Sequence, residues 1–137
     1  MTALEDFKTA LHRKDVHERV RKGLIGEGVE IAGPFGARQL HYADYVASGR
    51  ALAQVEDFIR DRVLPYYANT HTQASFCGAY MTELREAARS EIARLTGAGQ
   101  DVSVVFTGAG TTAGINRIVG LLELAELVSA GQRVVVL

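Results

Sequence analysis

The segment best suited to chemistry is a short loop of glycines and threonines, Gly108-Ala109-Gly110-Thr111-Thr112. Glycines let a backbone approach an anion closely, and the two hydroxyls add hydrogen-bond donors. A helix that begins at this loop would also direct its free N–H groups and its positive dipole end at the same anion. The loop has no Lys or Arg and lacks the Gly-Lys-Ser/Thr ending of a Walker loop. We therefore predict a site for a single phosphate group and not for a nucleoside triphosphate.

Two other interpretations of this loop stay open. The pattern Gly108-x-Gly110-x-x-Ala113 matches the relaxed fingerprint of dinucleotide-binding proteins. That fingerprint also needs an acidic residue at the end of the next strand, and here the predicted strand is still running at Leu137. The loop is also compatible with a plain strand-to-helix turn that needs glycine for its geometry alone.

The elements around the loop predict an α/β fold. An apolar run at Val102–Phe106 precedes the loop, a helix is expected over about 112–128, and another apolar run occupies Arg133–Leu137. This order forms a βαβ unit, which predicts two parallel strands joined by a right-handed crossover. Upstream, we expect helices over about 2–22, 51–63 and 79–96, and short strands near 29–31 and 39–42.

The composition describes an ordinary globular domain. The 137 residues are 47% hydrophobic and 23% charged, with a net charge of -1, which gives no support for nucleic-acid binding. The lone cysteine, Cys77, excludes an internal disulfide and is interpreted as a small packing residue. No histidine pair has metal-ligand spacing, so no metal is expected. No apolar run is long enough for a membrane span and no signal peptide is recognisable, so we expect a cytoplasmic protein.

Three blocks of sequence, in order, resemble the class V aminotransferase family. They are Tyr42–Gly49, Leu64–His71 together with the helix that carries Arg85–Arg89, and Val104–Asn116. The family includes cysteine desulfurases and selenocysteine lyases, which are fold-type-I enzymes that use pyridoxal phosphate. The resemblance covers roughly residues 40 to 137. Where the family usually has Glu after the threonine of the third block, this sequence has Thr112 or Ala113, depending on a shift of one residue.

The resemblance implies a three-layer large domain with a mainly parallel sheet, of which this chain would be the N-terminal portion. Residues 1–38 would form an N-terminal helix and arm, and residues 39–137 the first part of the cofactor-binding domain. It implies that the cofactor is pyridoxal 5'-phosphate, that the substrate is an amino acid and that the protein is a homodimer. The residues implied to hold the cofactor's phosphate are Ala109, Gly110, Thr111 and Thr112.

The first block lies near the substrate entrance in this family, which assigns Ala47, Ser48 and Gly49 to substrate binding. His71, in a polar loop, is a further candidate for the active site. A strand-to-helix turn at 47–49 and a surface or capping role for His71 are the corresponding alternatives. Neither segment contains a group whose type and spacing alone identify a reaction.

The residues that would perform the cofactor's chemistry are missing from these blocks. Such chemistry needs a Lys for the Schiff base and an Asp for the pyridinium nitrogen, but the lysines are Lys8, Lys14 and Lys22, all within the first predicted helix. We therefore assign no catalytic residue. The final apolar run leads us to expect the front part of a longer protein, with a short terminal strand of a small domain as the alternative. The resemblance implies that the longer protein is a pyridoxal-phosphate enzyme acting on an amino acid, by desulfuration, selenium removal, transamination or epimerisation. The alternatives are a dinucleotide-binding domain of an oxidoreductase and a non-enzymatic interaction module.

Overall fold

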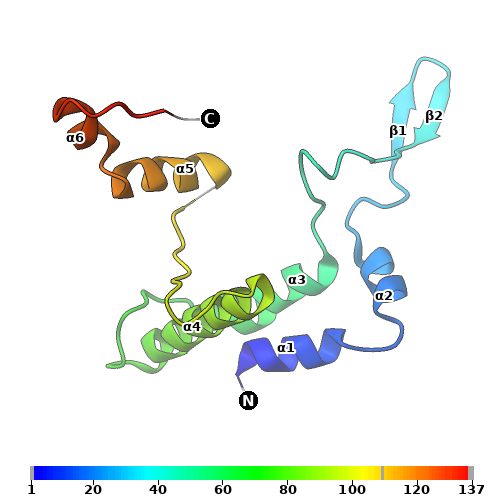
Figure 1. Cartoon of the computed structure of the whole chain (residues 1–137). Helices are drawn as coiled ribbons and strands as arrows, with labels where there is room; N and C mark the ends of the chain where they lie inside the picture. Colours follow the sequence, from blue (N-terminus) through cyan, green and yellow to red (C-terminus); the bar gives the residue numbers. More distant parts are fainter. Residues whose placement is uncertain (1, 109, 136–137) are drawn as a thin grey trace. The chain divides into compact units, whose positions relative to one another are not determined.

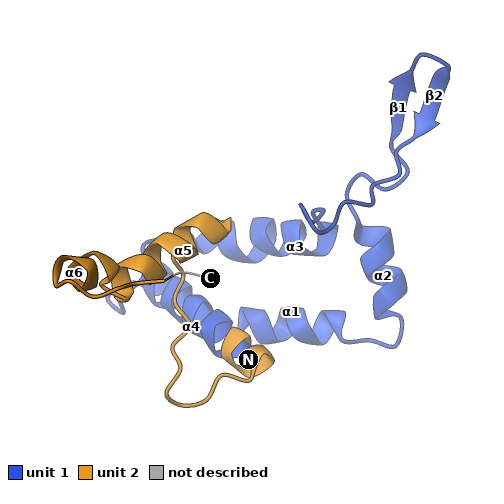
Figure 2. Ribbon diagram, turned by 45° about the horizontal axis from the view of Figure 1, so that its top comes forward, with its two compact units in different colours: residues 1–91 blue, residues 92–137 orange. Residues whose placement is uncertain are grey.

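The computed structural model describes residues 2–108 and 110–135. The chain divides into two compact units, residues 1–91 and residues 92–137, coloured blue and orange in Figure 2. Each unit is described by itself.

The first unit opens with two short helices, α1 (Ala3–Leu11) and α2 (Val16–Gly23). Thr2 begins α1 with a capping box, in which its hydroxyl accepts from the Glu5 N–H at 3.3 Å. The expected single helix over 2–22 is wrong, because a turn separates α1 from α2. Arg19 of α2 folds back across this turn and donates to the Ala10 carbonyl at 2.9 Å, which satisfies an acceptor near the end of α1.

A β-hairpin follows, made of β1 (Glu30–Gly33) and β2 (Gly36–Gln39) (Figure 1). The two strands are antiparallel, with Ile31 opposite Arg38. The strand expected near 29–31 is confirmed with a shift of about one residue, whereas the strand expected at 39–42 lies earlier, at 36–39. The glycines at the turn explain this shift, since Gly36 adopts φ +96°, which suits glycine best.

The helix expected over 51–63 is confirmed, although its hydrogen-bonding pattern changes along its length. It begins as α3 (Ala53–Phe58), continues as a π-helical segment η1 (Ile59–Val63) and closes as a 3-10 turn η2 (Leu64–Tyr66) that contains Pro65. On η1, the Arg60 guanidinium donates to the Asp61 carboxylate at 2.8 and 2.9 Å. This hydrogen bond lowers the pKa of the exposed Asp61 carboxyl.

The longest helix is α4 (Phe76–Thr96), which confirms the helix expected over 79–96 and extends it by three residues at its start. Its N-terminal part belongs to the first unit. There the ring of Tyr80 packs on the ring of Tyr66 from η2, with 4.8 Å between the ring centroids. Further along, Glu91 forms an ion pair with Lys8 at 2.7 Å. These contacts pack α4 against the elements that precede it.

The second unit contains the end of α4, then α5 (Gly110–Leu121) and α6 (Leu124–Ser129). The single helix expected over 112–128 is therefore wrong in its second half. The break falls at Glu123, whose φ of 49° and ψ of 40° are left-handed and incompatible with a continuous right-handed helix.

The parallel strands expected around α5 are not formed among the described residues. Residues 102–107 and 132–135 adopt no strand, and Val136 and Leu137 lie outside the described residues. The sheet that the structure does describe is the β1–β2 hairpin. A strand's hydrogen-bond ladder depends on its neighbours, so an apolar run alone does not fix it.

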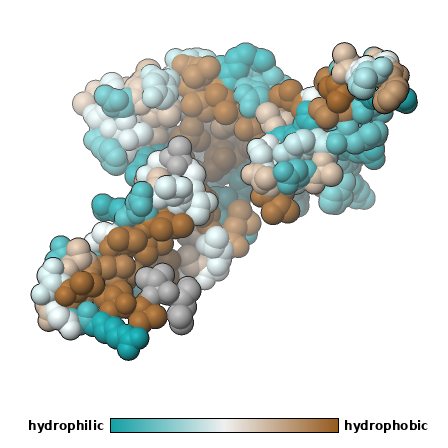
Figure 3. Space-filling view, turned by 90° about the horizontal axis from the view of Figure 1, so that it is seen from above, coloured by the Kyte–Doolittle hydropathy of each residue, from teal (hydrophilic) through white to brown (hydrophobic). Residues whose placement is uncertain are grey.

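Hydrophobic side chains are incompletely covered in both units. Among the described residues, no hydrophobic side chain is buried, and the buried positions are Gly23 and Gly78. Figure 3 shows hydrophobic side chains gathered on the visible surface. In the same described part of the chain, no helix has both the length and the apolar character needed to cross a membrane.

Candidate functional site

The glycine and threonine loop leads directly into α5 within the second unit. The helix begins at Gly110, two residues earlier than expected, and both Gly108 (φ +111°) and Gly110 (φ +74°) adopt backbone conformations that favour glycine. Thr111 and Thr112 occupy the first turn and are exposed. Ala109, the fourth residue assigned to the phosphate, lies outside the described residues. The structure thus puts three of the four predicted residues at one helix N-terminus.

This N-terminus suits an anion in both shape and charge. A Cβ added at Gly110 would meet no atom within 4 Å, so space is open beside the backbone. The first turn of α5 contains no acidic residue that would compete for the free N–H groups. Free N–H groups and two threonine hydroxyls are donors of the kind that a phosphate accepts. The residues present therefore fit the phosphate of pyridoxal phosphate.

The second candidate segment, Ala47–Gly49, belongs to a closed loop in the first unit. Its three residues are exposed. The Ser48 N–H donates to the Asp44 carbonyl at 3.1 Å, which draws the two sides of the loop together. The Tyr42 hydroxyl lies 2.6 Å from the Ser48 carbonyl and 3.0 Å from the Asp44 carbonyl. The predicted substrate residues are thus presented on a loop that Tyr42 holds.

Arg50 supports the same loop from its other end. Its guanidinium carbon lies 5.1 Å from the centre of the Tyr42 ring, within the range of a cation–π contact. Its Nε donates to the Ile25 carbonyl at 3.1 Å. Sequence analysis missed both Tyr42 and Arg50 as supports, because no spacing rule links residue 50 to residue 25.

His71 lies on the surface next to α4. Its backbone has a φ of 68°, an uncommon conformation for a residue other than glycine. The conformation is held by the Thr82 hydroxyl, which accepts from the His71 N–H at 3.0 Å and donates to the Gly78 carbonyl at 2.7 Å. His71 is an exposed residue. In the part of the chain that the structure describes, no hydrogen bond joins His71 to residues 47–49.

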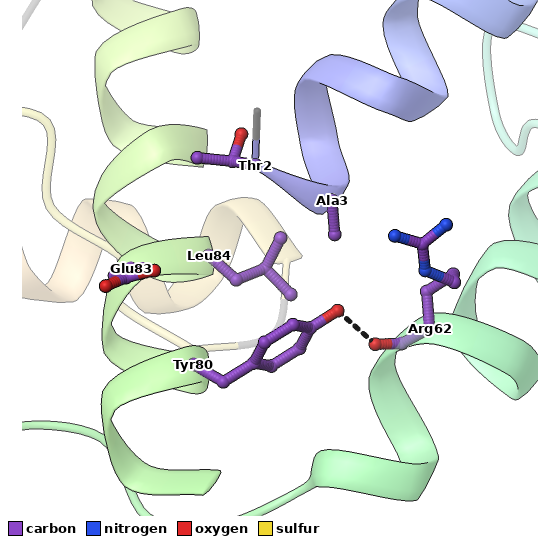
Figure 4. Close-up of a pocket in the computed structure, with 6 residues that line it drawn as sticks. All are labelled: Thr2, Ala3, Arg62, Tyr80, Glu83 and Leu84. Carbon is purple, nitrogen blue, oxygen red and sulfur yellow. Dashed lines mark hydrogen bonds between the residues drawn. The ribbon is translucent and has the colours of Figure 1, made fainter. Parts of the chain in front are cut away.

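A cavity of about 190 Å³ lies elsewhere in the first unit, where α1, η1 and α4 meet. Figure 4 shows Tyr80 reaching from α4 to the backbone of Arg62, to which its hydroxyl donates, with Leu84 and Ala3 facing the same space. Arg62 also approaches the Asp6 carboxylate at 3.3 Å. None of the residues predicted for the functional site lines this cavity.

In residues 2–108 and 110–135, no group of three or more His, Cys, Asp or Glu side chains lies close enough together to hold a metal ion. The free thiol of Cys77 is half-buried on α4. The candidate sites that remain are the glycine loop of the second unit and the two loops of the first.

Comparison with protein families gives a match. The family model for "Aminotransferase class-V" matches residues 41–137, a stretch that contains all three candidate loops. Neither the comparison with curated proteins nor that with solved structures found a match. Members of the matched family are, in general, pyridoxal-phosphate-dependent enzymes with a fold-type-I α/β architecture.

Proposed function

The chain belongs to the class V aminotransferase family, and we propose that residues 41–137 supply the phosphate-binding part of a pyridoxal-phosphate enzyme that acts on an amino acid. The observation that carries the proposal is the start of α5, where Gly110 has a positive φ and is followed by two exposed threonines in a turn without acidic residues.

In this proposal the phosphate lies against the helix N-terminus. The N–H groups of Gly110, Thr111 and Thr112 donate to its oxygens, and the two hydroxyls add further hydrogen bonds. Ala109, which precedes them, completes the assigned set. When bound, pyridoxal phosphate withdraws electrons from the α-carbon of an amino acid. The residues of this loop fix the cofactor's position and take no part in the proton transfers.

The substrate side of the proposal concerns two loops of the first unit. We assign Ala47, Ser48 and Gly49 to the substrate entrance, supported by their exposure and by the closed form of their loop. We assign His71 to the substrate as well, supported by the left-handed backbone that Thr82 stabilises, because strained conformations cluster at functional sites.

The region matched by the family contains no lysine. Lys8, Lys14 and Lys22 all precede residue 41. Two of them already have acidic partners, Lys8 with Glu91 at 2.7 Å and Lys22 with Glu18 at 2.6 Å. The proposal therefore assigns no catalytic residue and no Schiff-base lysine to the matched region.

The proposal also includes the finer features of the family. Residues 1–38 form an N-terminal arm, which carries α1, α2 and most of the β1–β2 hairpin, and residues 39–137 are the first part of a three-layer domain with a mainly parallel sheet. We propose a cytoplasmic homodimer. Desulfuration, selenium removal, transamination and epimerisation are all compatible with the residues present.

Titration with pyridoxal phosphate tests the phosphate site directly. Replacing both Thr111 and Thr112 with Ala should weaken binding, because a hydrogen bond to a charged group contributes about 1.5–3 kcal/mol. If the two act independently, affinity should fall by up to a few hundred-fold. A matched control is Thr96→Ala in the same unit, whose hydroxyl instead bonds the Ile92 carbonyl of α4. The control should leave affinity unchanged.

Melting temperature and a second ligand distinguish the alternatives. If the threonines serve only as residues of the first helical turn, their replacement leaves cofactor affinity unchanged and alters at most the melting temperature. Tighter binding of NAD than of pyridoxal phosphate would instead favour the dinucleotide site suggested by Gly108-x-Gly110-x-x-Ala113. Either result would contradict the proposed function.

A further inference from the structure

The loop assigned to the substrate entrance is tied to a segment that lies outside the region matched by the family. Residues 24–29 contact the chain on both sides of this loop. The Ile25 N–H donates to the Ala51 carbonyl at 2.9 Å, and the Leu40 N–H donates to the Val29 carbonyl at 2.8 Å. Leu24 and Leu52 form an additional β-bridge. Residues 41–50 are therefore closed off at both ends by the same short segment.

Arg50 connects this segment to the interior of the loop. Its Nε donates to the Ile25 carbonyl, while its guanidinium lies over the ring of Tyr42. A Cβ at position 26 would lie 1.7 Å from Nη2 of Arg50, so a side chain there would displace the guanidinium from its present position. One planar side chain thus contacts the 24–26 turn and the aromatic ring at the same time, which a single ammonium group is less suited to do.

Tyr42 contacts the backbone of the loop that contains the predicted substrate residues. Its single hydroxyl hydrogen faces two acceptors, with the Ser48 carbonyl at 2.6 Å nearer than the Asp44 carbonyl at 3.0 Å. The Tyr45 ring packs edge-on against it, with centroids 5.2 Å apart. The hydroxyl therefore donates mainly to Ser48 while lying within hydrogen-bonding distance of Asp44 on the other side of the loop, and the ring contacts both Arg50 and Tyr45.

We propose that Tyr42 and Arg50 are positioning residues, which hold the loop 44–49 in one conformation and anchor it to the turn at residues 24–26. The inference rests on the proposed function, which gives this loop to the substrate. Neither side chain is assigned to the substrate or cofactor itself. The N-terminal segment, although unmatched by the family, becomes part of the substrate-binding apparatus.

Two substitutions remove the connection with little change in packing. Tyr42→Phe deletes the hydroxyl and keeps the ring, and Arg50→Met deletes the guanidinium and keeps an unbranched side chain. Matched controls are Tyr67→Phe, on a tyrosine that is 73% exposed, and Arg38→Met, on the exposed strand β2. All four proteins are compared with the unaltered chain.

The first measurement is amide hydrogen exchange at residues 44–49. Exchange at Ser48 should become about five- to tenfold faster in Tyr42→Phe and Arg50→Met, as expected when one net hydrogen bond is lost. Both controls should match the unaltered chain. Unchanged exchange in Tyr42→Phe and Arg50→Met would overturn the inference, whatever the protein's function.

The second measurement uses the pyridoxal-phosphate-loaded protein, with L-cysteine and L-alanine as the probes. The amino-acid concentration that gives half of the change in cofactor absorbance should rise about five- to tenfold in both variants, whereas their affinity for pyridoxal phosphate should stay the same. Faster exchange without this rise would overturn the positioning role and leave the proposed function standing. If the unaltered protein does not bind pyridoxal phosphate, the proposed function fails, and the assignment of these residues to substrate positioning fails with it.

Discussion

Glycine at position 26 illustrates how one residue decides a local structure. Its φ of +89° favours glycine, and so does the Arg50 guanidinium that occupies the space of a Cβ. Gly36 in the hairpin turn has a similar φ of +96°, yet a Cβ there would meet nothing within 4 Å. The two positions therefore share a backbone constraint and differ in whether a side chain has room.

This pair yields a prediction about stability. Gly36→Ala should destabilise the chain by about 1 kcal/mol, because alanine is strained at positive φ. Gly26→Ala should cost at least about 1 kcal/mol more, since it also displaces Arg50 from the Ile25 carbonyl. Urea unfolding followed by circular dichroism measures both free energies of unfolding. Equal effects at the two positions would contradict the close approach of Arg50.

Helix α4 shows how an element is shaped by the segment packed against it. Gly78 is buried in its first turns, where a Cβ would lie 2.2 Å from the Thr72 methyl carbon. The Gly78 N–H donates to the Ser75 hydroxyl at 3.1 Å. The loop that carries His71 therefore packs directly on this helix. The absence of a side chain at Gly78 lets Thr72 approach the helix backbone.

The second prediction contrasts two helical glycines. Gly78→Ala should destabilise the chain by about 1–3 kcal/mol, because overpacking outweighs the gain in helix propensity. Gly120→Ala in α5, where a Cβ would meet nothing within 4 Å, should instead stabilise it by about 0.5–1 kcal/mol. Thermal unfolding of the two variants compares them directly. A stabilising Gly78→Ala would show that the loop does not pack on α4.

At the scale of the whole chain, the main feature is that large hydrophobic side chains are exposed to solvent. The described residues bury no hydrophobic side chain, and they expose large ones in both units, among them Phe35 at 85% and Leu121 at 66%. Exposed apolar surface of this kind is costly in water and favours association with other apolar surfaces.

The purified 137-residue chain should therefore self-associate, which light scattering measures. It should bind pyridoxal phosphate weakly and show no turnover of amino acids, because the family-matched region has the phosphate loop but no lysine. A single monomeric species would contradict the first expectation. Measurable amino-acid turnover would contradict the second.

The sequence by itself determined the features that depend on local chemistry. The helices over 51–63 and 79–96 were predictable because apolar residues recur at helical spacing on one face. The glycine and threonine loop was recognisable from its composition, and the family match over residues 41–137 confirms the family suggested by the three blocks. The cofactor assignments at Gly110, Thr111 and Thr112 stay predictions until binding is measured.

Only the tertiary structure decided the features that depend on distant contacts. The break between α1 and α2 is bridged by Arg19, the loop at 44–49 is held through Arg50 and Ile25, and His71 is fixed by Thr82. The apolar runs at 102–106 and 133–137 predicted strands that the described residues do not form. The three hydrogen bonds join residues 9 to 25 positions apart, and a strand likewise needs a partner elsewhere in the chain. Such partners leave no periodic signal in the sequence.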